Sequence, residues 1–189
     1  MAFYNEDELS EFGFKSIGTN VLISDKASIY NPSKISIGDN VRIDDFCILS
    51  AGSGGITIGR NVHIACYALL IGAGKITVGD YVGLSSRVSV YSSSDDYSGA
   101  FLTNPTVPSE YTNVDTAPVS FGQHALIGSG SVILPGVSLA EGVAVGALSL
   151  VTKSLDAWQI YSGAPARRLK ERKRDCLDLQ KQYEGLRKQ

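Results

Sequence analysis

Histidine and cysteine are scarce in this chain of 189 residues. It has two histidines, His63 and His124, and three cysteines, Cys47, Cys66 and Cys176, none of them in a Cys-x-x-Cys pattern. Two imidazoles are too few for a three-histidine zinc site, and three scattered cysteines indicate neither a disulfide framework nor a thiolate metal site. We therefore expect a protein with no metal, in which Cys47 packs inward and His124, at a turn, is structural.

Long apolar runs are also absent. No stretch approaches the roughly 20 residues that a membrane-spanning helix requires. The first residues, MAFYNEDELSEF, lack the basic and apolar regions of a signal peptide. We therefore expect no membrane span and a cytoplasmic location.

Net charge is low, but it is unevenly distributed. The formal charge is −2, and residues 167–189 hold nine Lys or Arg against four Asp or Glu, a net of +5 that leaves −7 for residues 1–166. A basic tail can indicate a nucleic-acid partner. Because the rest of the chain is acidic, we expect no nucleic-acid binding.

The feature present in abundance is a six-residue repeat. Apolar residues recur at steps of six in six groups of three, and the steps between groups are eight, nine, eight, thirty-one and six residues. Phe121 is the only member that is not aliphatic. The members are Ile17, Ile23, Ile29; Ile37, Ile43, Leu49; Ile58, Ile64, Leu70; Val78, Leu84, Val90; Phe121, Ile127, Ile133; and Leu139, Val145, Val151.

Such a repeat predicts a solenoid. One coil of about 18 residues cannot bury its own apolar face, so successive coils must stack as parallel strands. All extra residues enter between groups, which places every insertion at one corner of a three-sided coil. The sequence therefore predicts an all-β fold, a parallel β-helix of about six triangular coils in a single domain.

Segments outside the repeat complete the predicted domain. Residues 1–14 form an N-terminal cap with a short helix, in which Asn5 and Glu8 make a capping box. The β-helix covers residues 15–155 and carries a protruding loop, residues 91–120. Residues 156–189 form a C-terminal extension and helix. Its apolar residues at helical spacing are Leu169, Cys176, Leu179, Tyr183 and Leu186, and we favour packing of this helix on its own prism over a bundle with neighbouring copies.

Several runs near the C-terminus resemble a known family. The runs IGSGSV, ILPGVS, LAEGVA and VGALSL, followed by VTKS and GAPARRLK, are similar to the hexapeptide-repeat acyltransferases, most closely to the sugar O-acetyltransferases that act on galactosides and maltose. The resemblance covers roughly residues 15–172. It implies a left-handed β-helix, a homotrimer and acetyl-coenzyme A as acetyl donor. Handedness follows from the resemblance alone, since parallel crossovers are right-handed by default.

The resemblance also implies a cofactor groove near the C-terminal coils. Matched residue by residue, it assigns cofactor contacts to six positions. The spacing agrees for two of them, because Ser129 and Ala147 are eighteen residues apart and so stack on one face. The six are Ser129, Ala147, Thr152, Lys153, Arg167 and Lys170, of which Lys170 stands where the family usually has Arg.

The acceptor side departs from the family pattern. Relatives carry a catalytic histidine after the fourth coil, where this chain has Asp95, with Asp96 and Tyr97 beside it as acceptor contacts. A second matched position, usually an acceptor-positioning Asn, is Ala65. Three alternatives remain: Asp95 is the general base, His63 supplies the imidazole from the strand before Ala65, or a neutral amine acceptor needs little assistance.

Together these features predict an enzyme that moves an acetyl group from acetyl-coenzyme A to the hydroxyl of a polysaccharide, glycoconjugate or small saccharide. N-acetylation of an amino sugar nucleotide is the alternative. Because the family histidine is missing, a non-catalytic β-helix scaffold is a second alternative, although a scaffold has no need of the VTKS and GAPAR segments.

Overall fold

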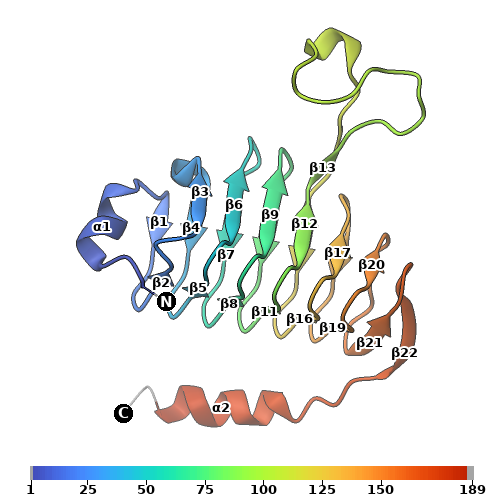
Figure 1. Ribbon diagram of the computed structural model, residues 1–189. Coiled ribbons are helices and arrows are strands. Elements are labelled where there is room, and N and C mark those ends of the chain that lie inside the picture. The colour runs from blue at the N-terminus through green and yellow to red at the C-terminus, as the bar shows by residue number, and fades with distance from the viewer. Residues whose placement is uncertain (1, 187–189) are drawn as a thin grey trace.

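The computed structural model describes residues 2–186, which form a triangular prism of very short strands (Figure 1). The strands stack into three parallel sheets, called sheets 1, 2 and 3 in the order in which each coil visits them. All eighteen repeat positions lie in strands, and all are buried except Ile17 and Ile29 of the first coil, which are partly buried. The predicted parallel β-helix is confirmed.

Sheet 1 contains the first strand of each of six coils. Its register stacks one repeat position on the next, as with Ile37 on Ile58 and Val78 on Phe121. The protruding loop therefore leaves the stacking intact. The strands are β1 (Ser16–Ile17), β4 (Ile35–Ile37), β7 (Ile56–Ile58), β10 (Ile76–Val78), β15 (Val119–Phe121) and β18 (Ser138–Leu139).

Sheet 2 is longer than the other two, because the chain continues beyond the sixth coil. Its parallel strands are β2 (Leu22–Ile23), β5 (Arg42–Ile43), β8 (His63–Ile64), β11 (Gly83–Leu84), β16 (Leu126–Ile127), β19 (Ala144–Val145) and β21 (Gln159–Ser162). A last strand, β22 (Arg167–Glu171), returns antiparallel to β21 and closes the sheet.

Sheet 3 completes each coil. Its strands are β3 (Ser28–Tyr30), β6 (Ile48–Ala51), β9 (Leu69–Gly72), β12 (Ser89–Tyr91), β17 (Val132–Ile133) and β20 (Leu150–Val151). A short 3-10 turn, Pro32–Lys34, follows β3. The core between the three sheets is filled by repeat residues and by small residues such as Cys47, which is fully buried; burial raises the pKa of its thiol to about 11.

A partial seventh coil was missed by the sequence analysis. Leu155 pairs with Leu139 of sheet 1, and Tyr161 pairs with Val145 of sheet 2, so two sides of another coil follow residue 151. The step from Val151 to Leu155 is four residues rather than six, which hid this coil from the repeat count. The predicted count of about six coils was therefore short by part of one coil.

Sharp turns between sheets place non-glycine residues in the left-handed conformation along two edges of the prism. On edge 1–2, between sheets 1 and 2, φ lies between +53° and +60° at Asn20, Asn40, Asn61, Tyr81, His124 and Trp158. On edge 2–3, between sheets 2 and 3, φ lies between +56° and +63° at Phe46, Tyr67, Arg87 and Leu148. Bulky residues rarely adopt this conformation, so tight stacking of the coils imposes it.

Glycines serve a different purpose at these turns. A Cβ on Gly38 would lie 2.8 Å from the carbonyl carbon of Gly59, and one on Gly79 would lie 2.8 Å from the carbonyl oxygen of Phe121. Both distances are too short for packed atoms. These positions need glycine because the next coil approaches closely, and not because φ is positive.

Helix α1 (Glu6–Glu11) covers the N-terminal end of the prism (Figure 1). Asn5 accepts a hydrogen bond from the backbone N–H of Glu8, whose carboxylate accepts one from the N–H of Asn5, so the predicted capping box is present. Leu9 is buried against the first coil. The cap thus shields a sheet end that would otherwise expose unpaired strands.

The long insertion projects well clear of the prism after the fourth coil, as predicted (Figure 1). Its neck is an antiparallel pair, β13 (Ser93–Ser94) with β14 (Asp115–Thr116). Beyond the neck lie a 3-10 turn, Ser109–Tyr111, and exposed apolar side chains that include Phe101 and Leu102. The paired neck fixes where the loop leaves the prism.

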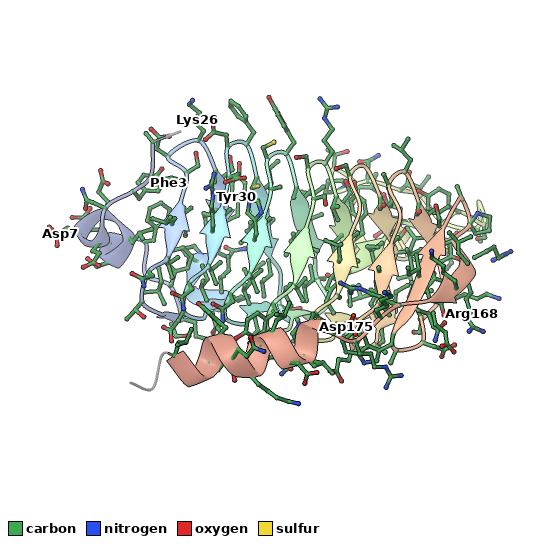
Figure 2. The ribbon with its side chains drawn as sticks, turned by 90° about the horizontal axis from the view of Figure 1, so that it is seen from below. Phe3, Asp7, Lys26, Tyr30, Arg168 and Asp175 are labelled. Carbon is green, nitrogen blue, oxygen red and sulfur yellow. The ribbon has the colours of Figure 1, made fainter. Side chains whose placement is uncertain are left out.

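Helix α2 (Cys176–Leu186) runs back beside the prism, as Figures 1 and 2 both show. Glu184 accepts hydrogen bonds from Arg60 at 2.7 Å and Tyr81 at 2.8 Å, and Gln180 contacts the Nε2 of His124 at 2.7 Å. The preference for packing on its own prism is therefore correct. The basis was only partly right, because Leu169 lies in β22 and Leu179, Tyr183 and Leu186 are exposed, whereas Cys176 and Leu177 are partly buried.

None of the helices within residues 2–186 is both long enough and apolar enough to cross a membrane.

Candidate active site

One groove on sheet 2 collects several of the predicted site residues. It has a volume of about 280 Å³ and opens where the coils turn from sheet 2 toward edge 2–3. Gly83 lies between His63 and Leu126 in register, so the missing side chain leaves a notch between two larger ones. The lining residues are His63, Ala65, Gly83, Leu84, Ser85, Ser86, Leu126 and Ser129.

His63 is held by a buried carboxylate. Its Nε2 donates to Oδ2 of Asp44 at 2.8 Å, and Arg42 donates to the other oxygen at 2.7 Å. Burial by itself would raise the pKa of Asp44, but the hydrogen bonds from Arg42 and His63 outweigh it and hold that pKa below its ordinary value. Asp44 therefore stays ionised and fixes the His63 ring, which leaves Nδ1 as the nitrogen able to accept a proton.

Two other residues of this groove contribute differently. Ala65 has no side-chain amide to offer, and its carbonyl oxygen accepts a hydrogen bond from the Cys47 thiol at 3.1 Å. Ser86 lies 3.3 Å from the sulfur of Cys66. Ala65 can therefore contact an acceptor only through its backbone or methyl group.

Asp95 lies in a separate and larger groove at the base of the protruding loop. This groove has a volume of about 700 Å³, and Tyr91, Tyr97 and Pro135 are among its lining residues. Asp95 is exposed, and Tyr97 is 94% exposed. Asp95 and His63, the two alternative bases predicted from the sequence, lie in two grooves of a single chain that share no lining residue.

Asp96 shapes the loop. Its carboxylate accepts hydrogen bonds from Ser98 and from the Asn113 side chain, which joins the two branches beyond the neck. These hydrogen bonds lower the pKa of Asp96 below its ordinary value. Asp96 thus positions the segment that carries Asp95 and Tyr97.

The distance between the two grooves follows from the strand that separates them. Ser85 lies before β12 and Asp95 lies after it, and three extended residues span about 10 Å. Within one chain, Ser85 and Asp95 therefore cannot both contact the same reacting atoms.

The predicted cofactor residues also fall into groups. Thr152, Lys153 and Arg167 line one shallow groove of about 220 Å³ beside β20. Ser129 lies in the groove of sheet 2, and the next coil stacks directly on it, since the N–H of Leu148 donates to the Ser129 carbonyl at 2.9 Å. Lys170 lies on β22 with its side chain exposed, outside both grooves. Within one chain the predicted cofactor residues therefore lie near the C-terminal coils but not in one common groove.

Ser85, Ser86 and Asp44 line or support the groove on sheet 2 and were not selected from the sequence. Ser85 and Ser86 gave no signal beyond being polar at a turn, and the pairing of Asp44 with His63 joins residues nineteen apart. His124, which was expected to be structural, stacks on Tyr81 with ring centroids 5.1 Å apart, and its role stays a prediction. Within residues 2–186, no cluster of His, Cys, Asp or Glu has the composition of a metal site.

A β-helix with a loop after the fourth coil and a polar C-terminal groove defines the class of this protein. No family model matches the chain. Sequence similarity to individual proteins nevertheless shows that the chain belongs to the hexapeptide-repeat acyltransferases, with the left-handed β-helix of that family. The resemblance noted in the sequence is confirmed.

The chain is similar to three proteins over most of its length. The chain is 53% identical over 180 residues to the dTDP-4-amino-4,6-dideoxy-D-glucose acyltransferase of Escherichia coli, covering 95% of this chain and 94% of that protein. The N-acyltransferase AntD of Bacillus cereus, in complex with dTDP and 3-hydroxybutyryl-CoA, is 50% identical with a TM-score of 0.95 and coverage of 99% and 98%. The galactoside O-acetyltransferase of Escherichia coli is 26% identical over 149 residues, covering 79% of this chain and 70% of that protein.

Variants of AntD are similar to the same degree. They carry substitutions at one serine or at an aspartate ten positions later, with 50% or 51% identity to this chain. Two of the serine variants are in complex with dTDP-4-amino-4,6-dideoxyglucose and coenzyme A.

Proposed function

We propose that this protein transfers the acyl group of an acyl-coenzyme A to the amino group of a dTDP-linked amino sugar. The support is the identity of 53% and 50% to two acyltransferases, of which one is named for dTDP-4-amino-4,6-dideoxy-D-glucose and the other is an N-acyltransferase solved with dTDP. Similarity to a hydroxyl-acylating relative is only 26%. An amine acceptor is therefore favoured over the hydroxyl acceptor that the motifs first indicated.

The spacing of one serine and one aspartate connects the proposal to particular residues. Ser85 and Asp95 of this chain are ten residues apart, the same spacing as the serine and aspartate substituted in AntD. Ser86 and Asp96 also have this spacing, but Asp96 is engaged by Ser98 and Asn113. The Ser85 and Asp95 pair is therefore the better match.

The proposed chemistry needs one proton acceptor. The amine nitrogen attacks the thioester carbonyl, a C–N bond forms, the C–S bond breaks, and coenzyme A leaves as a thiolate that takes up a proton. A sugar amine that arrives protonated must first lose a proton, and Asp95 is the group assigned to accept it. The hydroxyl of Ser85 is placed to donate to the thioester oxygen as it gains negative charge. His63, held by Asp44, is the second candidate for the proton acceptor.

A second copy of the chain is required to complete this site. Ser85 and Asp95 lie beyond opposite ends of the sheet 3 strand β12, so in this proposal the Asp95 of one copy faces the Ser85 of its neighbour. A closed threefold assembly supplies three equivalent sites of this kind. Each chain has a mass of 20.1 kDa, so light scattering should give about 60 kDa, and a mass of one chain would contradict the shared site.

The donor is proposed to lie along the C-terminal coils. Ser129 and Ala147 would contact the pantetheine arm, and Thr152, Lys153 and Arg167 share a groove suited to phosphates. Lys170 is exposed on β22 and would reach a phosphate only as a point charge. Acetyl-coenzyme A and 3-hydroxybutyryl-coenzyme A are the two donors to compare.

Release of free thiol tests the acceptor directly. With acetyl-coenzyme A, the rate with dTDP-4-amino-4,6-dideoxyglucose should exceed the rate with dTDP-glucose, which offers only hydroxyl groups, by at least about tenfold. Equal rates with both acceptors would favour the hydroxyl acceptor. No release with either, together with no change in melting temperature at millimolar acetyl-coenzyme A, would favour the scaffold.

Substitution of Asp95 tests the proposed base. Asp95→Asn removes the proton acceptor and should lower kcat by about tenfold or more, with KM for the donor unchanged. Asp115→Asn is the matched control, because Asp115 is an exposed carboxylate in the same neck, paired with Ser94. Full turnover by Asp95→Asn would transfer the role to His63, for which His63→Gln is the corresponding variant.

A further inference from the structure

Edge 2–3 carries a row of aromatic and cationic side chains on the first four coils. The rings of Phe46 and Tyr67 stack with centroids 5.0 Å apart. Lys26 lies over Phe46 at 5.8 Å, and the Arg87 guanidinium lies over Tyr67 at 5.8 Å. We call Lys26, Phe46, Tyr67 and Arg87 the aromatic ridge.

The ridge is exposed to solvent in residues 2–186. Phe46 is 46% exposed and Tyr67 is 51% exposed, and Arg87 is also exposed. Figure 2 shows α2 along one long side of the prism and Lys26 projecting from the other. Large aromatic rings held in a left-handed backbone conformation and left open to solvent contribute little to folding, which points to contact with something outside the chain.

The position of the ridge relates it to the reacting groups. Arg87 follows Ser85 and Ser86 in the same turn, whereas Phe46 and Tyr67 occupy the two preceding coils on the same edge. Coils stack about 4.8 Å apart, so the rings begin roughly 5 to 10 Å to the N-terminal side of Ser85. Ser129 and Ala147, assigned to the donor, lie on the C-terminal side. Donor and ridge thus approach Ser85 from opposite directions.

The charges of the ridge favour an anionic ligand at Arg87. Lys26 is already paired with Asp45, whose oxygen lies 3.6 Å from its Nζ. Among residues 2–186, no carboxylate makes an ion pair with Arg87. Its contact with Tyr67 is near the 6 Å limit of such interactions, so the guanidinium can exchange the ring for a phosphate at little cost.

We propose that the aromatic ridge binds the nucleoside diphosphate of the acceptor. The pyrimidine base stacks on the Tyr67 ring, and Arg87 moves from that ring to bind the diphosphate, which directs the sugar amine toward Ser85. Stacking of a base on an aromatic side chain stabilises nucleotide binding and requires no hydrogen bonds to the base. The exposed rings of Phe46 and Tyr67 can provide such a stacking surface. This inference rests on the proposed function and adds the site that selects a nucleotide-linked sugar over a free one.

Binding of dTDP alone tests the ridge without catalysis. Isothermal titration of the intact protein should detect dTDP, and Tyr67→Asn should weaken its binding at least tenfold; Asn suits the left-handed conformation and already occupies it at Asn61. Arg87→Ala should have a similar effect, whereas Arg87→Lys should restore only part of the affinity. Tyr30→Ala is the matched control, because Tyr30 is an equally exposed ring at the far end of a sheet 3 strand. It should bind dTDP as the unaltered chain does.

The outcomes separate this inference from the proposed function. In the thiol assay, Tyr67→Asn and Arg87→Ala should raise KM for the sugar nucleotide at least tenfold and leave KM for acetyl-coenzyme A unchanged. If the unaltered chain acylates the amine and neither variant has an effect, the proposed role of the ridge is wrong and the proposed function stands. If the unaltered chain binds dTDP, both variants lose this binding and no acylation occurs, the proposed role of the ridge stands and the proposed function is wrong. Absence of dTDP binding by the unaltered chain would overturn the ridge.

Discussion

Two edges of the prism share one backbone conformation, but the side chains along them have different surroundings. Edge 1–2 and edge 2–3 both place bulky residues at positive φ, coil after coil. On edge 1–2, α2 and the segment before it engage these residues: Gln180 contacts His124, and Arg174 lies over Trp158. On edge 2–3, within the part of the chain that the structure describes, the ring contacts of Phe46 and Tyr67 are with each other and with two cations.

The difference separates structural from functional aromatic residues in one repeat. A ring that is stacked and hydrogen-bonded by its own chain should matter for stability, and a bare ring should matter for binding. Burial and partners, rather than residue type or backbone conformation, carry this distinction. Substitutions along the two edges, taken in order from the largest to the smallest expected loss of stability, can test this distinction.

The largest effect is expected at Arg172, which closes edge 1–2. Its guanidinium donates to the carbonyl oxygens of His124 at 2.7 Å and Gly142 at 3.0 Å. Arg172→Ala leaves these carbonyls without a partner and should lower the free energy of unfolding by about 2 to 3 kcal/mol, measured by urea denaturation. Arg168→Ala, which removes an exposed cation from β22, should cost about 0.5 kcal/mol, and equal losses would show that edge 1–2 is not specially stabilised.

A somewhat smaller effect is expected at His124. Its ring stacks on Tyr81, lies 6.1 Å from the Trp158 ring, and binds Gln180. His124→Asn keeps a residue that tolerates positive φ but removes those contacts, so the loss should be about 1 to 2 kcal/mol. Acyl transfer per folded molecule should be unchanged. A loss of turnover without a loss of stability would move His124 into the active site.

The repeat shows how far the sequence alone could predict this structure. Register, core and the site of the loop all follow from a six-residue period, which is a local and additive signal. The position of α2 does not, because it depends on hydrogen bonds such as that from Arg60 to Glu184, 124 residues apart, while apolar helix residues such as Leu179 and Leu186 stay exposed. A helix pattern shows which face is apolar, but not whether that face meets the same chain.

The candidate site was predictable only in part for the same reason. Motifs located the polar C-terminal coils, and a single substitution in the family pattern selected Asp95. The separation of Asp95 from Ser85 follows from the repeat, because β12 lies between them in one coil, but the support of His63 by Asp44 arises from stacking of coils about twenty residues apart. No local pattern contains that information.

Lowering the pH should weaken the docking of α2 on edge 1–2. Hydrogen bonds from Gln180 and Tyr81, together with Arg60, lower the pKa of Glu184 from 4.5 to about 2. Since the folded pKa is the lower one, this contribution to docking of α2 is present above about pH 4.5 and is lost as the pH falls through about 2. Hydrogen exchange of α2 amides should accelerate over that range while the coils stay protected. Glu184→Gln should remove the pH dependence, whereas Asp178→Asn, on the exposed side of α2, should keep it.

The smallest effect on stability is expected at Phe46, and it decides the comparison. Phe46→Asn retains a residue suited to positive φ and removes one exposed ring from a stacked pair, so the loss should stay below about 1 kcal/mol in the same urea series. If the ridge binds the nucleotide, the same variant should weaken dTDP binding severalfold, because the support beneath Tyr67 is gone. A loss of stability as large as that of His124→Asn would mean that exposure does not distinguish the edges. The aromatic residues of edge 2–3 would then be structural, like those under α2.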